Sequence, residues 1–450
     1  MSSGLDISYK NGSHSFYGIM KIYVNSGNFI INGAQKVMGQ SFTASAPIYS
    51  LPITLESESA FSINISPISQ DNLHPSEIPY YFPSNIPEGF TSYFPGVMYS
   101  PIFHGPSFPK SACFYLDSIL KYPPSKTFIA GNKGAGKSTF TRFFVNKVIS
   151  KYGKVGLIDI DPGQPEVSIP GSISFAILDD YLLHPPERNI TPDAISYFYG
   201  SNSVSDNLPL YLECVSSIME HVPSDLYCIV NSFGWVNDLG LKVHQDLMQV
   251  IKPENMIFLA KANDTIAPIR ERMFVVNIES RPGAQSIKPK QQRDIRVLSL
   301  FNKYLRPLSC IHPQFISFSD VRIGIMYSEV HPTEYLTALN GSLVALCFDD
   351  RNYPQSKKLI TIIKSITSIR AIGFGIVKAI DKQTHQFALI TNLNLAENKI
   401  NTILMGSVCP PIEVYKDSPR NEANFLDIVL SMKSPLMKDP LALKNPTILD

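Results

Sequence analysis

The sequence has 450 residues and a net charge of +1, with 44% hydrophobic and 17% charged residues. This length exceeds one ordinary core and predicts two or three globular domains. The near-neutral charge excludes a global attraction to nucleic acid, so such binding would need a local groove. Six cysteines without a C-x-x-C pair exclude a cysteine zinc site or a disulfide framework. With neither a signal peptide nor a membrane-length apolar run, the sequence predicts a soluble intracellular protein.

Residues 1–120 are predicted to form an N-terminal β-rich domain. Aromatic and β-branched residues dominate the stretches 15–24 and 28–33, and Gly, Asn and Ser punctuate them. That composition is typical of short strands. Prolines accumulate from 70 to 125 and indicate an irregular connector.

A complete phosphate-binding loop follows the apolar run 127–130 and opens onto a helical pattern. Its glycines allow the backbone to curl round a phosphate with the N–H groups pointing inward, and the helix adds the positive end of its dipole. Lys137 can reach the β- and γ-phosphates, and the Ser138 hydroxyl can hold Mg²⁺. The residues predicted to bind ATP are Gly131, Asn132, Lys133, Gly134, Ala135, Gly136, Lys137, Ser138 and Thr139.

The region 121–320, which contains this loop, shows strands alternating with helices. Such alternation builds a parallel sheet with helices on both faces. The predicted strands are 126–131, 155–160, 226–231, 256–260 and 273–278, and the predicted helices are 136–151, 207–221, 238–251 and 291–305.

The strand pattern returns in the C-terminal region 321–450, at 342–347, 372–377 and 387–390. The proline-containing tail 431–450 is predicted to be extended. The expected fold class is therefore α/β, with a P-loop NTPase core between N-terminal and C-terminal β-rich modules.

Two carboxylates, Asp159 and Asp161, end the apolar strand that follows the loop helix. Residues two apart on a strand face the same side, so both can face the phosphates. One could hold the water shell of Mg²⁺ while the other accepts a proton from an attacking hydroxyl. The alternative is a structural turn, since Asp-Pro-Gly is also good turn chemistry.

Two further features allow two interpretations each. Trp235, the single tryptophan, follows another apolar strand; it could stack on a nucleobase or pack against the next helix. Arg293 and Arg296 share a helical face, where they could close on a transferring phosphate or simply be solvated.

Together these motifs resemble the polynucleotide 5′-hydroxyl kinase family, whose members phosphorylate the 5′-hydroxyl of RNA or DNA with ATP. The resemblance rests on four segments in the family's order: the loop 131–138, Asp161-Pro162-Gly163-Gln164, Asn231-Ser232-Phe233-Gly234-Trp235, and the pair Arg293 and Arg296. The stretches 159–166 and 371–380 are similar to the branch that processes pre-ribosomal RNA.

The resemblance implies a role for each matching residue. Asp161 would be the base that activates the 5′-hydroxyl, and Lys137 would act on the phosphates. Asp159 and Ser138 would hold Mg²⁺, with Gln164 in support and near the substrate. Trp235, Asn202 and Asn207 would contact RNA, and Arg293 and Arg296 would form a lid.

The segment 200–207 departs from the family's substrate clasp. Asn202 stands where threonine is usual, and Val204 stands where proline is usual. Ser232 likewise replaces a threonine. These departures concern substrate grip rather than the class of reaction.

The sequence therefore predicts an ATP- and Mg²⁺-dependent RNA 5′-hydroxyl kinase. The resemblance also implies pre-rRNA spacer processing, an endonuclease partner and a nuclear, nucleolar location, while the lack of a membrane-length apolar run predicts no membrane association. The extended tail is a candidate contact for that partner. Two alternatives stay open: a nucleotide-binding scaffold with little turnover, and a hydrolytic switch in which Gln164 positions water.

Overall fold

The structure, a computed structural model, divides the chain into two compact units. The first comprises Met1–Asp161, Phe175–Thr191 and His221–Ile295, and the second comprises Pro162–Ser174, Pro192–Glu220 and Arg296–Asp450. The residues that it describes are 4–69, 73, 77–106, 108–279, 283–301, 312–351, 360–391 and 393–411. The predicted tail 431–450 and the end of the predicted helix 291–305 lie outside these residues. The division into domains at 1–120, 121–320 and 321–450 stays a prediction.

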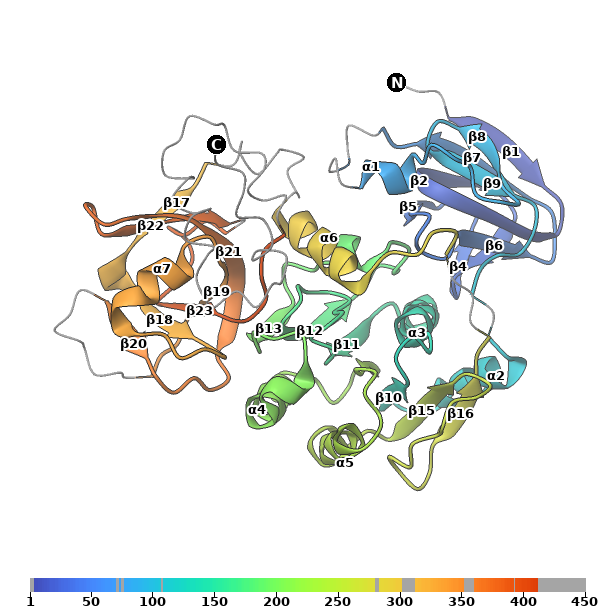
Figure 1. Cartoon of the computed structure of the whole chain (residues 1–450). Coiled ribbons are helices and arrows are strands. Elements are labelled where there is room, and N and C mark those ends of the chain that lie inside the picture. The colour runs from blue at the N-terminus through green and yellow to red at the C-terminus, as the bar shows by residue number, and fades with distance from the viewer. Residues whose placement is uncertain are drawn as a thin grey trace. The chain divides into compact units, whose positions relative to one another are not determined.

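The N-terminal part of the first unit is an antiparallel sheet organised around the long strand β2 (Gly12–Ser26), drawn in blue in Figure 1. β2 pairs with β5, β6, β7 and β9 along its length. Near its end Lys21 and Tyr23 are exposed while Ile22 and Val24 are buried, the alternation of a strand with one face on a core. The other strands are β1 (Leu5–Tyr9), β3 (Asn28–Ile31), β4 (Ala34–Val37), β5 (Ser41–Ala46), β6 (Ile53–Ser57), β7 (Phe61–Pro67), β8 (Thr91–Phe94) and β9 (Val97–Ser100).

The proline-rich stretch 70–125 is more regular than predicted. It contains the hairpin β8–β9, whose second strand pairs with β2, and two helices, α1 (Ile78–Tyr81) and α2 (Lys110–Ile119). Gly96 takes a φ of 76° in the turn between the hairpin strands. Prolines stand where these elements tolerate them, with Pro79 in the first turn of α1, Pro95 in the hairpin turn and Pro109 at the N-cap of α2. Pairing with a distant strand supplies the order that local sequence does not indicate.

The rest of the first unit is the predicted parallel sheet, in the order β16-β15-β10-β14-β11. β10 pairs in parallel with β14 on one side and with β15 on the other. The five predicted strands are confirmed to within a few residues. They are β10 (Lys126–Gly131), β11 (Val155–Asp159), β14 (Cys228–Asn231), β15 (Asn255–Ala260) and β16 (Phe274–Asn277).

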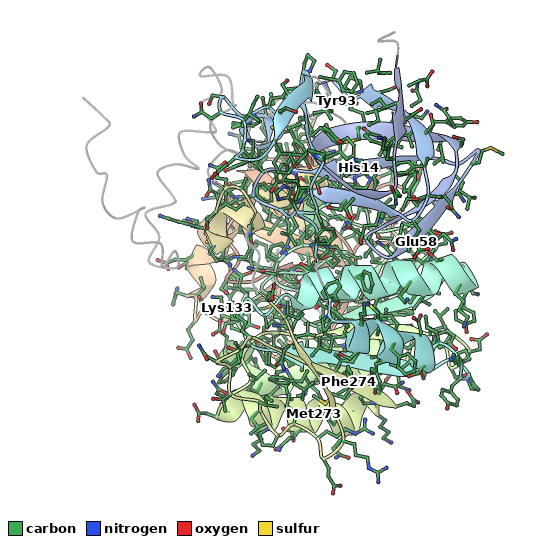
Figure 2. The ribbon with its side chains drawn as sticks, turned by 90° about the vertical axis from the view of Figure 1, so that its right-hand side faces the viewer. His14, Glu58, Tyr93, Lys133, Met273 and Phe274 are labelled. Carbon is green, nitrogen blue, oxygen red and sulfur yellow. The ribbon has the colours of Figure 1, made fainter. Side chains whose placement is uncertain are left out.

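Helices α3 (Lys137–Tyr152) and α5 (Leu239–Ile251) cover the two faces of this sheet (Figure 1). α3 also contacts the N-terminal sheet, because the Asn146 side chain donates to the Asn32 carbonyl at 2.9 Å. At the β16 edge, Tyr115 of α2 stacks on Phe274, which is labelled in Figure 2, with ring centroids 4.1 Å apart.

The second unit is built on strands from two separate parts of the chain. β13 (Ile195–Phe198) pairs antiparallel with β21 (Arg370–Asp381), and β21 pairs with β19 and β22. The strand β13, from the predicted central domain, therefore belongs to the same compact unit as the predicted C-terminal strands. The remaining elements are β17 (Gln314–Ser317), β18 (Arg322–Ile325), β19 (Leu343–Cys347), β20 (Thr361–Ile363), β22 (Gln386–Thr391), β23 (Thr402–Met405), α4 (Leu208–Met219) and α7 (Tyr335–Leu339).

Two elements span a point where the chain passes between the units: β12 (Ser172–Leu178) and α6 (Pro289–Phe301). Across the described residues, none of the helices has both the length and the apolar character that a membrane span requires.

Candidate nucleotide-binding site

The phosphate-binding loop joins the end of β10 to the start of α3, as predicted. Gly131, Gly134 and Gly136 have φ values of 149°, 74° and 82°, a region that favours glycine. At Gly131 there is also no room for a side chain, since a Cβ would lie 2.3 Å from the Leu259 carbonyl oxygen of β15. Lys133, labelled in Figure 2, is exposed on the loop.

Lys137 is folded back onto the loop that precedes it. Its ammonium donates to the Gly131 carbonyl at 2.9 Å and to the Asn132 carbonyl at 3.0 Å, and the residue is only 8% exposed. Burial lowers its pKa to about 8, and the negative charge of Asp161 opposes this shift. Lys137 and Asp161 are therefore close enough to interact electrostatically.

The predicted metal residue Asp159 is fully buried at the end of β11, directly opposite Asn231 of β14. The Asn231 amide donates to Asp159 Oδ1 at 3.0 Å, and Thr141 of α3 donates to Asn231 Oδ1 at 3.4 Å. This chain of polar groups fixes the carboxylate across three elements. The sequence analysis assigned no role to Asn231 or Thr141.

Asp161 lies two residues beyond Asp159 and is half-buried. Between them, the Ile160 N–H donates to the Asn231 carbonyl at 3.0 Å and so extends the pairing of β11 with β14. The pairing fixes the backbone on which both aspartates stand, beside the phosphate-binding loop.

Gly234 lies against the phosphate-binding loop. A Cβ on Gly234 would lie 2.8 Å from Lys133 Cα and 3.1 Å from Lys137 Nζ. A side chain here would have to displace the loop backbone, which is a requirement that the sequence analysis did not identify. The one signal for this requirement in the sequence is that Gly234 follows a predicted apolar strand of the same sheet as β10.

The segment before Gly234 is held by a buried histidine of α5. Ser232 donates to the Ile129 carbonyl of β10 at 2.7 Å. His244 Nε2 lies 3.4 Å from Ser232 Oγ, and His244 Nδ1 lies 2.8 Å from the Gly240 carbonyl. Burial lowers the pKa of His244 to about 4, so its imidazole is neutral at pH 7.

Trp235 combines features of both interpretations. Its ring packs on Gly240 at the start of α5, where a Cβ would lie 2.7 Å from two ring carbons. The residue is nevertheless half-exposed, so part of it remains accessible.

Gln164, Asn202 and Asn207 belong to the second unit. Asn207 is the N-cap of α4, where its Oδ1 accepts from the Leu210 N–H at 3.1 Å. Asn202 Oδ1 is buried and accepts no hydrogen bond among the described residues. Gln164 is half-buried in the turn after Asp161.

Arg293 and Arg296 both lie on α6, three residues apart, as predicted. Arg293 is half-buried, and Arg296 is only 5% exposed. The boundary between the two units falls between Ile295 and Arg296. The first unit alone therefore brings together the phosphate-binding loop, Asp159, Asp161 and Trp235.

Comparison with known proteins agrees with this geometry. Residues 131–305 match the family model "mRNA cleavage and polyadenylation factor CLP1 P-loop". Polynucleotide 5′-hydroxyl-kinase NOL9 of Danio rerio is 25% identical over 332 residues, which cover 63% of this chain and 46% of the relative. The chain resembles the polynucleotide 5′-hydroxyl kinases. The resemblance inferred from the motifs is thus confirmed.

Other relatives carry the same name. NOL9 of Homo sapiens is 24% identical over 64% of this chain and 50% of its own length. NOL9 of Arabidopsis thaliana is 25% identical over 69% of this chain and 93% of its own length. The chain spans about half the length of the first two relatives.

A solved structure shares the fold. A chain of the wild-type Clp1p–Pcf11p complex aligns with a TM-score of 0.61 and 14% identity, covering 91% of this chain and 99% of that chain. With the family match, this likeness confirms the predicted P-loop α/β class with β-rich sheets.

The residues present fit a nucleoside triphosphate. Glycine backbone, the start of α3 and the Lys137 ammonium converge on one loop, which is how P-loops hold phosphates. Among the described residues, no three His, Cys, Asp or Glu side chains group to hold a metal ion by themselves. Mg²⁺ bound with phosphates needs only one or two protein oxygens, which Ser138 and Asp159 can provide.

Proposed function

We propose that this protein is an ATP-dependent polynucleotide 5′-hydroxyl kinase that transfers the γ-phosphate of ATP to the 5′-hydroxyl of RNA. The observation that carries the proposal is the position of Asp161, two residues beyond the end of β11 at the sheet edge that carries the phosphate-binding loop, where its charge acts on the Lys137 ammonium. A nucleotide scaffold needs the lysine but has no use for a carboxylate at the reacting end of the phosphates. The similarity to proteins named polynucleotide 5′-hydroxyl-kinase supports the same reaction.

Asp161 acts as the general base. It takes the proton of the RNA 5′-hydroxyl as the hydroxyl oxygen bonds to the γ-phosphorus and the bond to ADP breaks. Lys137 leaves its loop carbonyls to neutralise phosphate oxygens. Asp159 and Ser138 would hold Mg²⁺, with Gln164 in support, and the ion would screen the phosphate charges.

The RNA end is held by residues outside the loop. Trp235 stacks on a base with its accessible part, and Asn202 and Asn207 contribute polar contacts. Arg293 and Arg296 form a lid whose guanidinium groups stabilise the charge on the transferring phosphate. A buried Arg296 suits this role because a guanidinium out of water interacts more strongly with phosphate.

The biological setting belongs to the same proposal. The protein acts in the nucleolus on pre-rRNA spacer fragments, whose 5′-hydroxyl ends an endonuclease partner generates. Its three domains are 1–120, 121–320 and 321–450, with the kinase chemistry in the second.

Phosphate transfer by variants tests the proposal. Wild type and Asp161→Asn are compared for transfer of γ-phosphate to a 5′-hydroxyl RNA, with ATP binding measured in parallel. Asp225→Asn removes an exposed carboxylate of the same unit and serves as the matched control. Transfer that falls at least about a hundredfold only in Asp161→Asn, with ATP binding kept, supports the base. A wild type that binds ATP but transfers nothing, alone or with the endonuclease, would instead be a nucleotide-binding scaffold.

A further inference from the structure

The loop that follows β15 reaches the phosphate-binding loop from the side opposite Gly234. β10 lies between β14 and β15 in the sheet, and Gly131 is paired with Leu259. Because the strands are parallel, the chain leaves β15 at the same edge as the phosphate-binding loop. Residues 261–264 therefore lie beside that loop.

Lys261 places its ammonium beside the phosphate-binding loop. Its Nζ would be 3.6 Å from a Cβ built on Gly134, in the middle of the loop. The other ammonium on the loop, that of Lys137, contacts the carbonyls of Gly131 and Asn132. The ammonium groups of Lys137, at the start of α3, and of Lys261, after β15, therefore both lie beside a loop whose backbone conformation binds anions.

Hydrogen bonds fix the segment that carries Lys261. Asp264 Oδ2 accepts from the Lys261 N–H at 2.9 Å, and the Asp264 N–H donates to the Lys261 carbonyl at 3.0 Å. The Lys261 N–H and then the Asn132 side chain lower the pKa of Asp264, so its carboxylate is ionised at pH 7. The effect of Asn132 on Asp264 means that the segment lies close to the phosphate-binding loop, and its own hydrogen bonds fix the backbone that carries the Lys261 side chain.

We propose that Lys261 is a second nucleotide-binding lysine, which binds the polyphosphate of ATP across Gly134. This inference rests on the proposed function only in that the loop binds a nucleoside triphosphate. Lys261 follows β15 and Asp161 follows β11, on opposite sides of β10 in the sheet, so Lys261 contributes affinity for ATP rather than chemistry. A role limited to neutralising Asp264 is the alternative that the test must separate.

The experiment measures the dissociation constants of Mg-ATP and AMP by calorimetry for wild type, Lys261→Met, Lys261→Arg and Lys242→Met. Lys242 is an exposed lysine of α5 and provides the matched loss of one charge. We expect Lys261→Met to bind ATP about tenfold more weakly and AMP within about twofold of wild type, because the lost attraction scales with phosphate charge. Lys261→Arg, which keeps the charge, and Lys242→Met should both bind ATP as wild type does.

Unchanged ATP affinity in Lys261→Met would overturn the inference. So would an equal loss for ATP and AMP together with a lower melting temperature of the nucleotide-free variant, since that pattern assigns Lys261 to holding its own loop. If the wild type binds ATP but transfers no phosphate, the kinase proposal fails while the ATP affinities still decide the role of Lys261. A wild type that binds no ATP overturns both.

Discussion

The side-chain amide of Asn231 donates a 3.0 Å hydrogen bond to the buried carboxylate of Asp159. The two residues are register partners at the carboxyl ends of β14 and β11. This bond is one of the contacts that stabilise the buried carboxylate, and it orients a group that the proposed function assigns to Mg²⁺. The strand pairing thus builds the side of the site that the proposed function assigns to the metal ion.

Removing this bond should affect both stability and activity. Asn231→Ala leaves Asp159 without its amide donor, so we expect a loss of roughly 1–3 kcal/mol in the free energy of unfolding. A higher Mg²⁺ requirement for phosphate transfer should accompany it. Urea unfolding and a Mg²⁺ titration of activity measure the two effects, with the exposed Asn237→Ala as control. An unchanged Mg²⁺ requirement in Asn231→Ala would contradict the assignment of Asp159 as a Mg²⁺ ligand.

Gly234→Ala should weaken nucleotide binding. The added methyl group would lie 2.8 Å from Lys133 Cα, so the phosphate-binding loop must shift. We expect ATP affinity to fall by about tenfold or more, since P-loop contacts depend on backbone positions. Calorimetric titration with ATP measures the loss. Wild-type affinity in the variant would mean that the loop tolerates the shift.

ATP affinity should fall as pH rises above 8. The pKa of Lys137 is lowered to about 8 by burial, and bound phosphates would raise it again because they favour the charged ammonium. Binding therefore takes up a proton above pH 8 and weakens by up to about tenfold per pH unit there. In Lys137→Met this dependence should vanish. The same lysine makes the free energy of unfolding increase as pH rises from about 8 to the higher pKa of the unfolded chain. In this window the unfolded state binds the proton and the folded state does not.

Acid should destabilise the first unit through His244. Its pKa of about 4 in the folded state lies below the usual value of 6.5, so the unfolded chain binds the proton first. The contribution to stability is complete above pH 6.5 and decreases as pH falls toward 4, by roughly 2 kcal/mol between pH 6.5 and 5. Urea unfolding at pH 7 and pH 5 should show a smaller difference in His244→Asn than in wild type. Equal differences would show that other groups, such as His184, dominate.

Asn207 variants separate capping from substrate binding. Asn207→Ala removes the cap of α4 and should cost about 1 kcal/mol of stability. Asn207→Asp keeps the cap but adds a charge that repels RNA phosphates. The proposed function predicts a raised KM for RNA in Asn207→Asp at wild-type stability. If the KM for RNA equals that of wild type, Asn207 serves only as the N-cap of α4 and does not bind RNA.

Local pattern was enough to predict the parts of the fold that depend on neighbours in sequence. The phosphate-binding loop, the five parallel strands and helix α3 could be predicted, because glycine positions and apolar periodicity fix them locally. The pairing of β9 with β2 and of β13 with β21 could not, since each joins distant segments. The contacts of Asn231 and Gly234, and the position of Lys261 beside the phosphate-binding loop, could not be predicted for the same reason.

The two interpretations of Trp235 show a second limit of prediction from the sequence, which concerns the use of a single side chain. The sequence placed it after a strand, where it could stack on a base or pack on the next helix. In the structure its ring packs on Gly240 while the residue stays half-exposed. Residue type and position cannot separate these uses of an aromatic ring, because both require the same flat apolar surface.

Transfer of labelled γ-phosphate from ATP to two matched RNAs tests the central claim most directly. The RNAs share one sequence, and one ends in a 5′-hydroxyl while the other already carries a 5′-phosphate. The proposed function predicts label on the first RNA only, with ADP released in equal amount. ATP hydrolysis that proceeds equally with either RNA, without labelled product, would contradict the kinase and favour a hydrolytic switch.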